Sequence, residues 1–407
     1  MTRSAERRRL PPLLWLLGGI SFATDTASEA IYPLLPLFLT EVLGARALSL
    51  GIIEGVAEAT ASVAKVVSGR IADRWPARRP LVVAGYGVSS AVRPLIGLAS
   101  GWLQVLALRF VDRIGKGVRA APRDAMLAAA AAPGQRARVY GAHRAMDHAG
   151  AVAGPLLAAT FLWFAPGAYR ELFLATIVPG VAVGILLTRL PRDRGPSGVP
   201  EPAPLASQPP ESGSSSTWRS LPRAYVRLLL VLLLFTLGNS TDAYLLLRLS
   251  ALGATTAAIP LLWAMLHVVK SVTSVAGGWV ADRYGRRRVI VTGWLVYAAV
   301  YGGFAMVDSL PLAATLFLAY GLYFGLTEGA EKALVADVTP ERLRGTAFGL
   351  YGGVLGVGAL LASVLFGLVW EGAGSAAAFS MGALLALAAA AALPFAVPRG
   401  LIAASRG

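Results

Sequence analysis

The chain alternates between long apolar stretches and short polar segments. Twelve of the stretches reach the roughly 20 residues that an α-helix needs to cross the hydrocarbon core of a bilayer. They are too long and too continuous to be strands of a membrane barrel. The predicted spans are residues 12–41, 49–74, 80–100, 103–131, 138–164, 169–190, 224–250, 256–282, 289–307, 311–337, 343–370 and 375–397. The pattern predicts an all-α integral membrane protein with twelve transmembrane helices.

One polar segment is much longer than the others. Residues 191–221 contain seven prolines, several serines and glycines, and no apolar run. Such a composition cannot bury a core, so it is typical of a disordered linker. The chain is therefore expected to consist of a six-helix bundle at 1–190, a cytoplasmic linker, and a second six-helix bundle at 222–407.

The composition agrees with the pattern. Hydrophobic residues make up 56% of the chain and charged residues only 14%, against about 25% charged in soluble domains. This excludes a soluble enzyme, a disordered protein and a collagen-like fibre. The chain has no cysteine, which excludes disulfides and thiolate metal sites. Its three histidines are spread apart, and we predict no metal centre.

Basic residues are unevenly distributed between the two sets of loops. Both terminal segments and the loops on their side hold 23 Lys and Arg, whereas the opposite loops hold two, Arg46 and Arg170. Because Lys and Arg concentrate in cytoplasmic loops, both termini are predicted to be cytoplasmic, in the inner membrane of a prokaryote. No small-residue cleavage site follows the basic N-terminal segment, so we expect an uncleaved first helix. The net charge of +15 is thus a topology signal and predicts no nucleic-acid partner.

The two halves repeat a basic loop motif. The first copy follows the second span and the other follows the eighth, with their aspartates 209 residues apart. Parallel repeats of this kind build transporters that hold substrate between the halves, near the midplane. The motif residues are Gly69, Asp73, Arg74, Arg78 and Arg79 in the first copy, and Gly278, Asp282, Arg283, Gly285, Arg286 and Arg287 in the second.

On these residues the chain resembles the major facilitator superfamily. The resemblance covers twelve spans, a central linker and the family's "motif A" in both halves; the first copy departs from the motif, with Pro76-Ala77 in place of one glycine. It implies two pseudo-symmetric six-helix bundles, a monomer as the usual unit, and loops that latch the outward-facing state. The alternative is that these loops only set the topology.

The predicted fifth helix carries a second signature. Gly150, Gly154 and Pro155 resemble an antiporter motif and place the chain nearest to drug/proton antiporter-like bacterial exporters, with alanines in place of the motif's last two glycines. In the family this motif marks exporters that exchange substrate for protons. The alternative is ordinary packing, because small residues four apart let helices approach closely.

The predicted helices contain 22 charged residues. At roughly 2.5–3.5 kcal/mol each in lipid, they would cost about 60 kcal/mol unpaired, so they must face one another or a wet central cavity. Two groups follow. Candidates for proton coupling or substrate contact are Asp25, Glu29, Glu54, Glu58, Lys116, Arg119, Asp147, His148, Asp242, His267, Lys270, Glu328 and Glu331. A charge network around the fourth helix comprises Arg109, Asp112, Arg113, Arg123, Asp124 and Arg144.

The function predicted is secondary active transport by alternating access. We expect proton-coupled efflux of a small anionic, zwitterionic or amphiphilic organic compound, driven by the proton gradient and without a cofactor. Asp25 and Glu29, one helical turn apart, are the predicted coupling pair. Proton-coupled uptake and export of a divalent metal are the alternatives, although the many cations disfavour metal. No HExxH or GxSxG motif is present, so an enzyme is not expected.

Overall fold

The computed structural model describes residues 10–74, 78–130, 136–191, 221–340 and 344–397. Within these ranges every regular element is helical. The predicted linker at 191–221 lies almost wholly outside the described residues, so its state stays a prediction.

The N-terminal half begins with a helix that prolines interrupt. Pro33 and Pro36 cannot donate backbone hydrogen bonds, and the first predicted span divides there into four short elements. These are α2 (Pro12–Ile31), η1 (Tyr32–Leu34), α3 (Leu35–Leu37) and the π-helical η2 (Phe38–Val42). The half continues with α4 (Ala47–Arg74), α5 (Arg79–Leu95), η3 (Ile96–Leu98), α6 (Trp102–Ala130), α7 (Arg136–Phe164), α8 (Tyr169–Ala175) and α9 (Ile177–Thr188).

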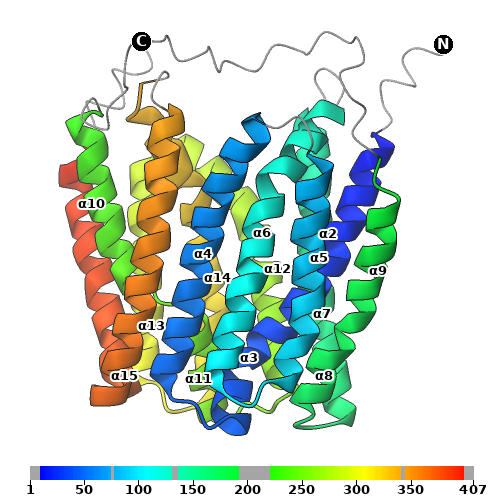
Figure 1. Cartoon of the computed structure of the whole chain (residues 1–407). Coiled ribbons are helices and arrows are strands. Elements are labelled where there is room, and N and C mark those ends of the chain that lie inside the picture. The colour runs from blue at the N-terminus through cyan, green and yellow to red at the C-terminus, as the bar shows by residue number, and fades with distance from the viewer. Residues whose placement is uncertain (1–9, 75–77, 131–135, 192–220, 341–343, 398–407) are drawn as a thin grey trace.

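The C-terminal half has the same succession of long helices. They are α10 (Arg223–Gly238), α11 (Ala243–Ala251), α12 (Ala258–Tyr284), α13 (Arg286–Met306), α14 (Leu310–Asp337) and α15 (Arg344–Ala396). Gly374 interrupts α15 with a φ of 87°, a backbone conformation that glycine adopts without strain. The chain reverses direction at this point (Figure 1).

In the part of the chain that the structure describes, seven helical segments are long and apolar enough by themselves to cross a membrane. They include α4, α5, α13 and α14, whereas α6 is not among them and carries seven charged residues. Two predicted crossings, 343–370 and 375–397, lie within the single element α15. The structure therefore shows an all-helical membrane fold, and the number of twelve crossings stays a prediction.

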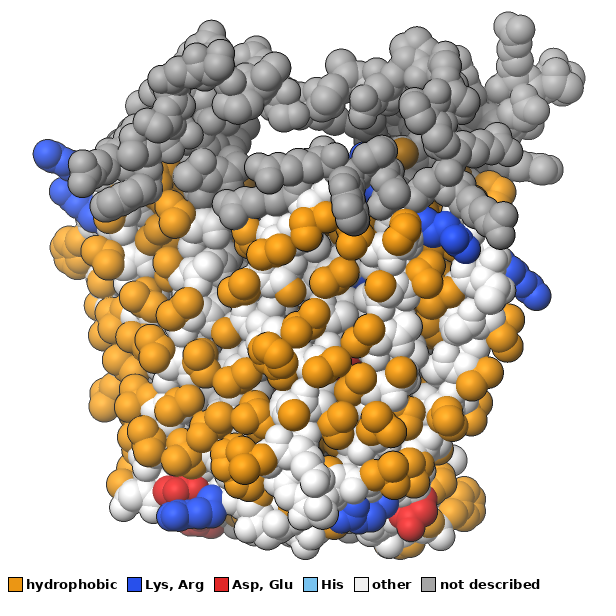
Figure 2. All heavy atoms as spheres, in the orientation of Figure 1, with side chains coloured by type: hydrophobic (Ala, Val, Ile, Leu, Met, Phe, Trp, Pro, Cys, Tyr) orange, Lys and Arg blue, Asp and Glu red, His pale blue; other side chains and the backbone are white. Residues whose placement is uncertain are grey.

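The outer surface is apolar around the middle of the molecule. Figure 2 shows hydrophobic side chains over this belt, with charged side chains near its upper and lower rims. Large apolar side chains are exposed on the molecule, among them Trp163 at 76%, Phe164 at 80% and Phe395 at 81%. A belt of this kind is stable only against lipid, so the chain is a multi-pass membrane protein.

The two halves stand side by side and pack through α4 against α15 and through α7 against α12 (Figure 1). Glycines allow this approach: a Cβ at Gly51 would lie 2.3 Å from the carbonyl oxygen of Ser363. We call the end where α2 begins and α9 and α15 finish the near end, and the end where α3, α8 and α11 lie the far end (top and bottom of Figure 1). The predicted orientation makes the near end cytoplasmic.

Candidate functional site

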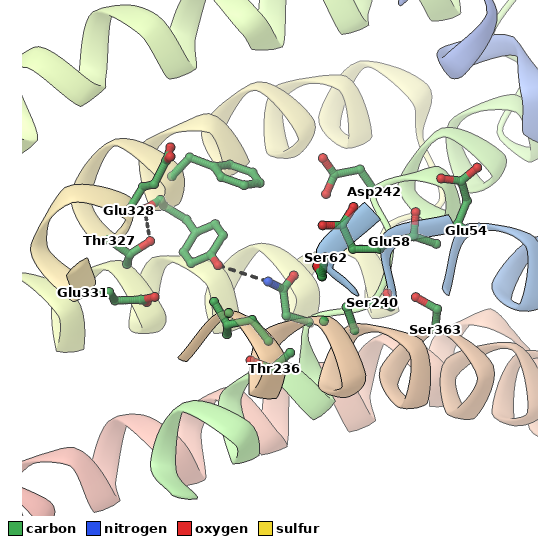
Figure 3. Close-up of a pocket in the computed structure, with 18 of the residues that line it drawn as sticks. Glu54, Glu58, Ser62, Thr236, Ser240, Asp242, Thr327, Glu328, Glu331 and Ser363 are labelled. Carbon is green, nitrogen blue, oxygen red and sulfur yellow. Dashed lines mark hydrogen bonds between the residues drawn. The ribbon is translucent and has the colours of Figure 1, made fainter. Parts of the chain in front are cut away.

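A cavity of about 730 Å³ lies between the two halves. Its walls come from α2, η1, α4 and α6 on one side, and from α10, the α10–α11 connection, α12, α14 and α15 on the other. Figure 3 shows several of the polar side chains that face it. Twelve acidic, basic and histidine side chains line the cavity: Glu29, Glu54, Glu58, Lys65, Arg113, Lys116, Asp242, His267, Lys270, Glu328, Glu331 and Lys332.

The cavity gathers nine of the thirteen predicted candidates for proton coupling or substrate contact. These are Glu29, Glu54, Glu58, Lys116, Asp242, His267, Lys270, Glu328 and Glu331. The other four, Asp25, Arg119, Asp147 and His148, are not part of this lining. The predicted coupling pair is thus divided, because Glu29 faces the cavity and Asp25 does not.

The seventh predicted span, 224–250, is not one helix. It stops at Gly238 and resumes at Ala243, and Asn239–Asp242 between the two helices line the cavity. The sequence indicates this break through the run from Gly238 to Asp242. Its five residues, Gly, Asn, Ser, Thr and Asp, all have low helix propensity. Discontinuous membrane helices present polar groups at the binding sites of transporters, so this break belongs to the site.

Asp242 lies at this break and is held by two partners. Its carboxylate accepts a hydrogen bond from the Tyr320 hydroxyl at 2.7 Å and pairs with the Lys270 ammonium at 3.2 Å. The Lys270 Nζ also lies 3.6 Å from the centre of the Phe324 ring. The pair is therefore locked by neighbours of its own half.

Glu29 connects the two halves at the cavity wall. Its carboxylate accepts a hydrogen bond from the Trp263 indole of α12 at 2.9 Å, and the His267 Nε2 lies 3.8 Å away. Nearby, the Tyr32 and Thr241 hydroxyls are 3.3 Å apart. Glu29 is thus a titratable group whose contacts lie across the interface.

Four charged side chains of the cavity have no direct partner among the described residues. Glu58, Lys65, Arg113 and Lys116 appear in no hydrogen bond or ion pair of their side chains, and the buried Arg113 Nε lacks an acceptor. All four belong to α4 and α6. Among these four unpaired groups there are three cations and one carboxylate, which favours an anionic group beside them in the cavity.

Other charges of α6 form buried pairs inside the N-terminal half. Arg93 and Asp112 meet at 3.1 Å with side chains 4% and 1% exposed, and Arg109 meets Glu54 at 2.6 Å. Arg119 donates to the Ser89 hydroxyl at 2.8 Å. Arg123 pairs with Asp124 at 2.9 Å, and Arg144 lies 3.9 Å from Asp147. The predicted network around the fourth helix therefore includes a buried structural part, while Arg113 faces the cavity.

Two acids of α14 have different surroundings. Glu331 is 9% exposed and accepts hydrogen bonds from the Trp294 indole at 3.1 Å and the Tyr351 hydroxyl at 3.3 Å. Glu328 pairs with Lys332 at 3.0 Å, and these side chains are 60% and 53% exposed. Because the exposed pair lies toward the near end of α14, the cavity opens in that direction.

Side chains from both halves close the cavity at the far end. Glu371 accepts a hydrogen bond from the Leu48 backbone N–H at 2.9 Å and pairs with Arg46 at 3.1 Å. The Tyr244 hydroxyl lies 3.0 Å from the Ala47 carbonyl oxygen and 3.1 Å from that of Ser363. These residues were missed at the sequence level, because nothing in their spacing indicates a partner in the other half.

The repeated basic loops contact helix ends of their own half. Arg79 donates to the Leu190 carbonyl at 3.0 Å, Arg287 to that of Val397 at 2.8 Å, and Arg286 pairs with Asp337. Cations at helix C-termini are favourable, so these contacts stabilise each bundle. Gly285 joins α12 to α13 with a φ of 92°. Arg283 lies over the Tyr284 ring, and the Arg78 backbone carbonyl oxygen accepts the Val82 backbone N–H. The structure does not describe the surroundings of Gly69, Asp73, Arg74, Gly278 and Asp282. The predicted latch therefore stays a prediction.

The antiporter-like motif forms a close contact between α7 and α2. A Cβ at Gly150 would lie 2.5 Å from the Phe22 carbonyl oxygen, and one at Gly154 would lie 2.4 Å from that of Thr26. Pro155 lies inside α7, which continues past it. The motif therefore lets two helices touch, as its packing interpretation requires, and its link to antiport stays a prediction.

We expect Gly154→Ala to destabilise the protein by about 1–3 kcal/mol, because its methyl group would overlap backbone atoms of α2. Thermal denaturation in detergent measures the change. Gly302→Ala in α13 is the matched control, since a Cβ there meets nothing within 4 Å. Equal melting temperatures for the two variants would show that the α2–α7 contact is not tight.

A family model described as "Major Facilitator Superfamily" matches residues 15–269 and 244–405. The chain belongs to the major facilitator superfamily. An uncharacterized MFS-type transporter of Methanocaldococcus jannaschii is 31% identical over 374 residues, covering 89% of this chain and 90% of that protein. A Na⁺, Li⁺, K⁺/H⁺ antiporter of Planococcus maritimus is 32% identical over 114 residues, 26% of this chain and 27% of that protein.

Solved structures agree on the fold. A POT family transporter in complex with 5-aminolevulinic acid superposes with a TM-score of 0.79 over 96% of each chain, at 11% identity. At that identity the likeness concerns architecture alone. Membership of the superfamily makes this chain a transporter of a small molecule rather than an enzyme, as the sequence predicts.

Proposed function

We propose that this transporter exports a small organic compound carrying an anionic group, in exchange for protons. The observation that supports this most is the central cavity, in which Arg113 and Lys116 face the space without partners. A substrate carboxylate or phosphate would supply the missing acceptors, since Arg and Lys bind such groups strongly. The apolar part of the substrate would lie against Trp263, Phe324 and Tyr323, which line the opposite wall.

Glu29 is the proposed coupling group of this cycle. As a carboxylate it accepts the Trp263 N–H from the other half at 2.9 Å. Protonation removes the charge and weakens this hydrogen bond, because bonds to ionised acceptors are the stronger ones. Loss of the bond loosens α2 from α12 and lets the halves move, which couples proton binding to a change of access.

The direction of transport is proposed on two supports. One is the resemblance of Gly150, Gly154 and Pro155 to the antiporter motif. The other is the partial similarity to the Planococcus maritimus antiporter. For the metal alternative, the described residues contain no group of three or more His, Asp or Glu side chains that could hold an ion.

Flux into proteoliposomes tests the proposal. A panel of radiolabelled small organic acids, amino acids and amphiphilic drugs is offered outside, with the lumen acidic. Exchange for protons predicts accumulation of at least one compound, and collapse of that accumulation when nigericin dissipates the gradient. Accumulation only when the outer medium is acidic would identify a symporter, and gradient-driven uptake of a divalent cation alone would establish the metal alternative.

A further inference from the structure

A buried chain of polar side chains lies inside the N-terminal half, apart from the central cavity. Ser21 of α2, Tyr86 of α5 and His143 of α7 are 2%, 1% and 4% exposed. The Ser21 hydroxyl lies 2.8 Å from the Tyr86 hydroxyl and 3.1 Å from His143 Nε2. On its other side, His143 Nδ1 lies 3.5 Å from an Asp147 carboxylate oxygen. A histidine is thus buried between hydroxyl groups and an acid, and the cavity mechanism uses none of them.

Asp147 lies close to Asp25, the acid of α2 that does not line the cavity. Gly150, one turn after Asp147 on α7, faces α2 so closely that a Cβ there would lie 3.1 Å from the Asp25 Cβ. Asp25 and Asp147 therefore lie on neighbouring turns of two packed helices. One oxygen of Asp147, Oδ1, is buried without a hydrogen-bond partner, and the Asp25 carboxylate has no direct partner among the described residues. A neighbouring like charge disfavours the ionisation of both acids together, so one of the two tends to hold a proton.

The charges around this cluster come from every helix packed on it. Lys116, Arg119 and Arg123 of α6 face the two acids, and Glu29 lies one turn along α2 from Asp25. On α7, Arg144 lies 3.9 Å from Asp147 and His148 stands beside it. Across the interface, His267 of α12 and Glu328 of α14 face His148. Because the Arg144 guanidinium pairs with Asp147 and the Asp25 carboxylate has no direct partner among the described residues, we place the proton mainly on Asp25.

We propose that Asp25, Asp147 and His143 form a proton-holding site that is separate from the substrate cavity. The proton leaves the Asp25 carboxyl oxygen, is accepted by Asp147, and passes to His143 Nδ1, which leaves two carboxylates and an imidazolium. The Ser21 hydroxyl accepts the remaining N–H, at Nε2, and the Tyr86 hydroxyl hydrogen-bonds to Ser21, so the ring is held in place. This inference rests on the proposed proton coupling. It makes α2 the connecting element, with Asp25 in the proton site and Glu29 in the cavity one turn away.

The chain contains three histidines, which allows a direct test. Protein labelled with ¹⁵N-histidine in lipid nanodiscs is titrated by NMR, and His143→Gln, His148→Gln and His267→Gln assign the signals. We expect Asp25→Asn and Asp147→Asn each to shift the titration midpoint of His143. Asp308→Asn, a change at an acid that is 94% exposed, should leave it unchanged. An unchanged His143 midpoint in Asp25→Asn would overturn the proposal.

Infrared spectroscopy and flux separate this inference from the function on which it rests. The carbonyl band of protonated carboxyl groups should lose intensity in Asp25→Asn at neutral pH and stay unchanged in Asp308→Asn. If wild-type flux follows the pH gradient and His143→Gln flux follows it equally, the proton site is refuted while antiport stands. If wild-type flux ignores the gradient, antiport is refuted, and the NMR titration still decides whether the three residues share a proton.

Discussion

Replacing Asp112 by alanine is expected to destabilise the protein by about 3–5 kcal/mol, which is the cost of leaving a buried charge without its partner. The Asp112 side chain is 1% exposed, and it neutralises Arg93, which is 4% exposed. Arg93 also donates to the Thr24 carbonyl oxygen at 2.7 Å, so the pair ties α5 and α6 to α2. Loss of the carboxylate leaves a guanidinium in a nearly anhydrous bundle.

Thermal denaturation and the fraction of monodisperse protein in detergent measure this effect. The matched control is Asp308→Ala, which removes the acid of the Arg248–Asp308 ion pair on the surface. Exposed pairs contribute less than about 1 kcal/mol, so this variant should behave like the wild type. Equal stability of the two variants would show that Arg93 finds another acceptor and that the buried pair is not structural. Arg93→Leu combined with Asp112→Leu should recover part of the loss, because it removes both charges.

Glu29→Gln is expected to abolish accumulation driven by the pH gradient while preserving exchange of substrate for substrate. Glutamine is uncharged like the protonated carboxyl group, so it is a weaker acceptor for the Trp263 N–H and leaves the halves free to move. The amide cannot bind or release a proton in the physiological range, so the movement of the halves is no longer linked to protonation. Accumulation against a gradient should fall to that of protein-free liposomes.

Counterflow and gradient-driven uptake are measured on the same proteoliposomes. Glu171→Gln, in the exposed first turn of α8, is the control that should retain both activities. Full gradient-driven accumulation by Glu29→Gln would remove Glu29 from the coupling role. Loss of counterflow as well would assign Glu29 to substrate binding instead.

Much of the architecture follows from the chain's apolar pattern. Runs long enough to span lipid predict the helices, and the same energetics predicts a polar interior, because Glu58 or Lys116 could not face hydrocarbon. The structure contains such a cavity, and Glu58 and Lys116 line it. Helix periodicity also places Glu54 and Glu58 together on the cavity side of α4.

The pairing inside the bundles does not follow from sequence. Periodicity places Arg109, Asp112 and Arg113 on neighbouring faces of one helix, but only the packed neighbours make Asp112 a partner of Arg93 and leave Arg113 in the cavity. For the same reason Asp25 and Glu29, one turn apart, lie in different environments. His143 escaped notice because its partner Ser21 is 122 residues away along the chain, and Tyr86, which bonds to Ser21, is 65 residues from Ser21.

Distances between spin labels at the two ends of the molecule test the central claim, which is that protonation moves the halves around the cavity. The natural absence of cysteine allows labels at Ser100→Cys with Ala251→Cys at the far end, and at Thr188→Cys with Tyr284→Cys at the near end. Rocking of the halves predicts that acidification lengthens one distance and shortens the other. In Glu29→Gln both distances should stay constant on acidification. Two distances that stay constant, or that change in the same direction, would contradict the account.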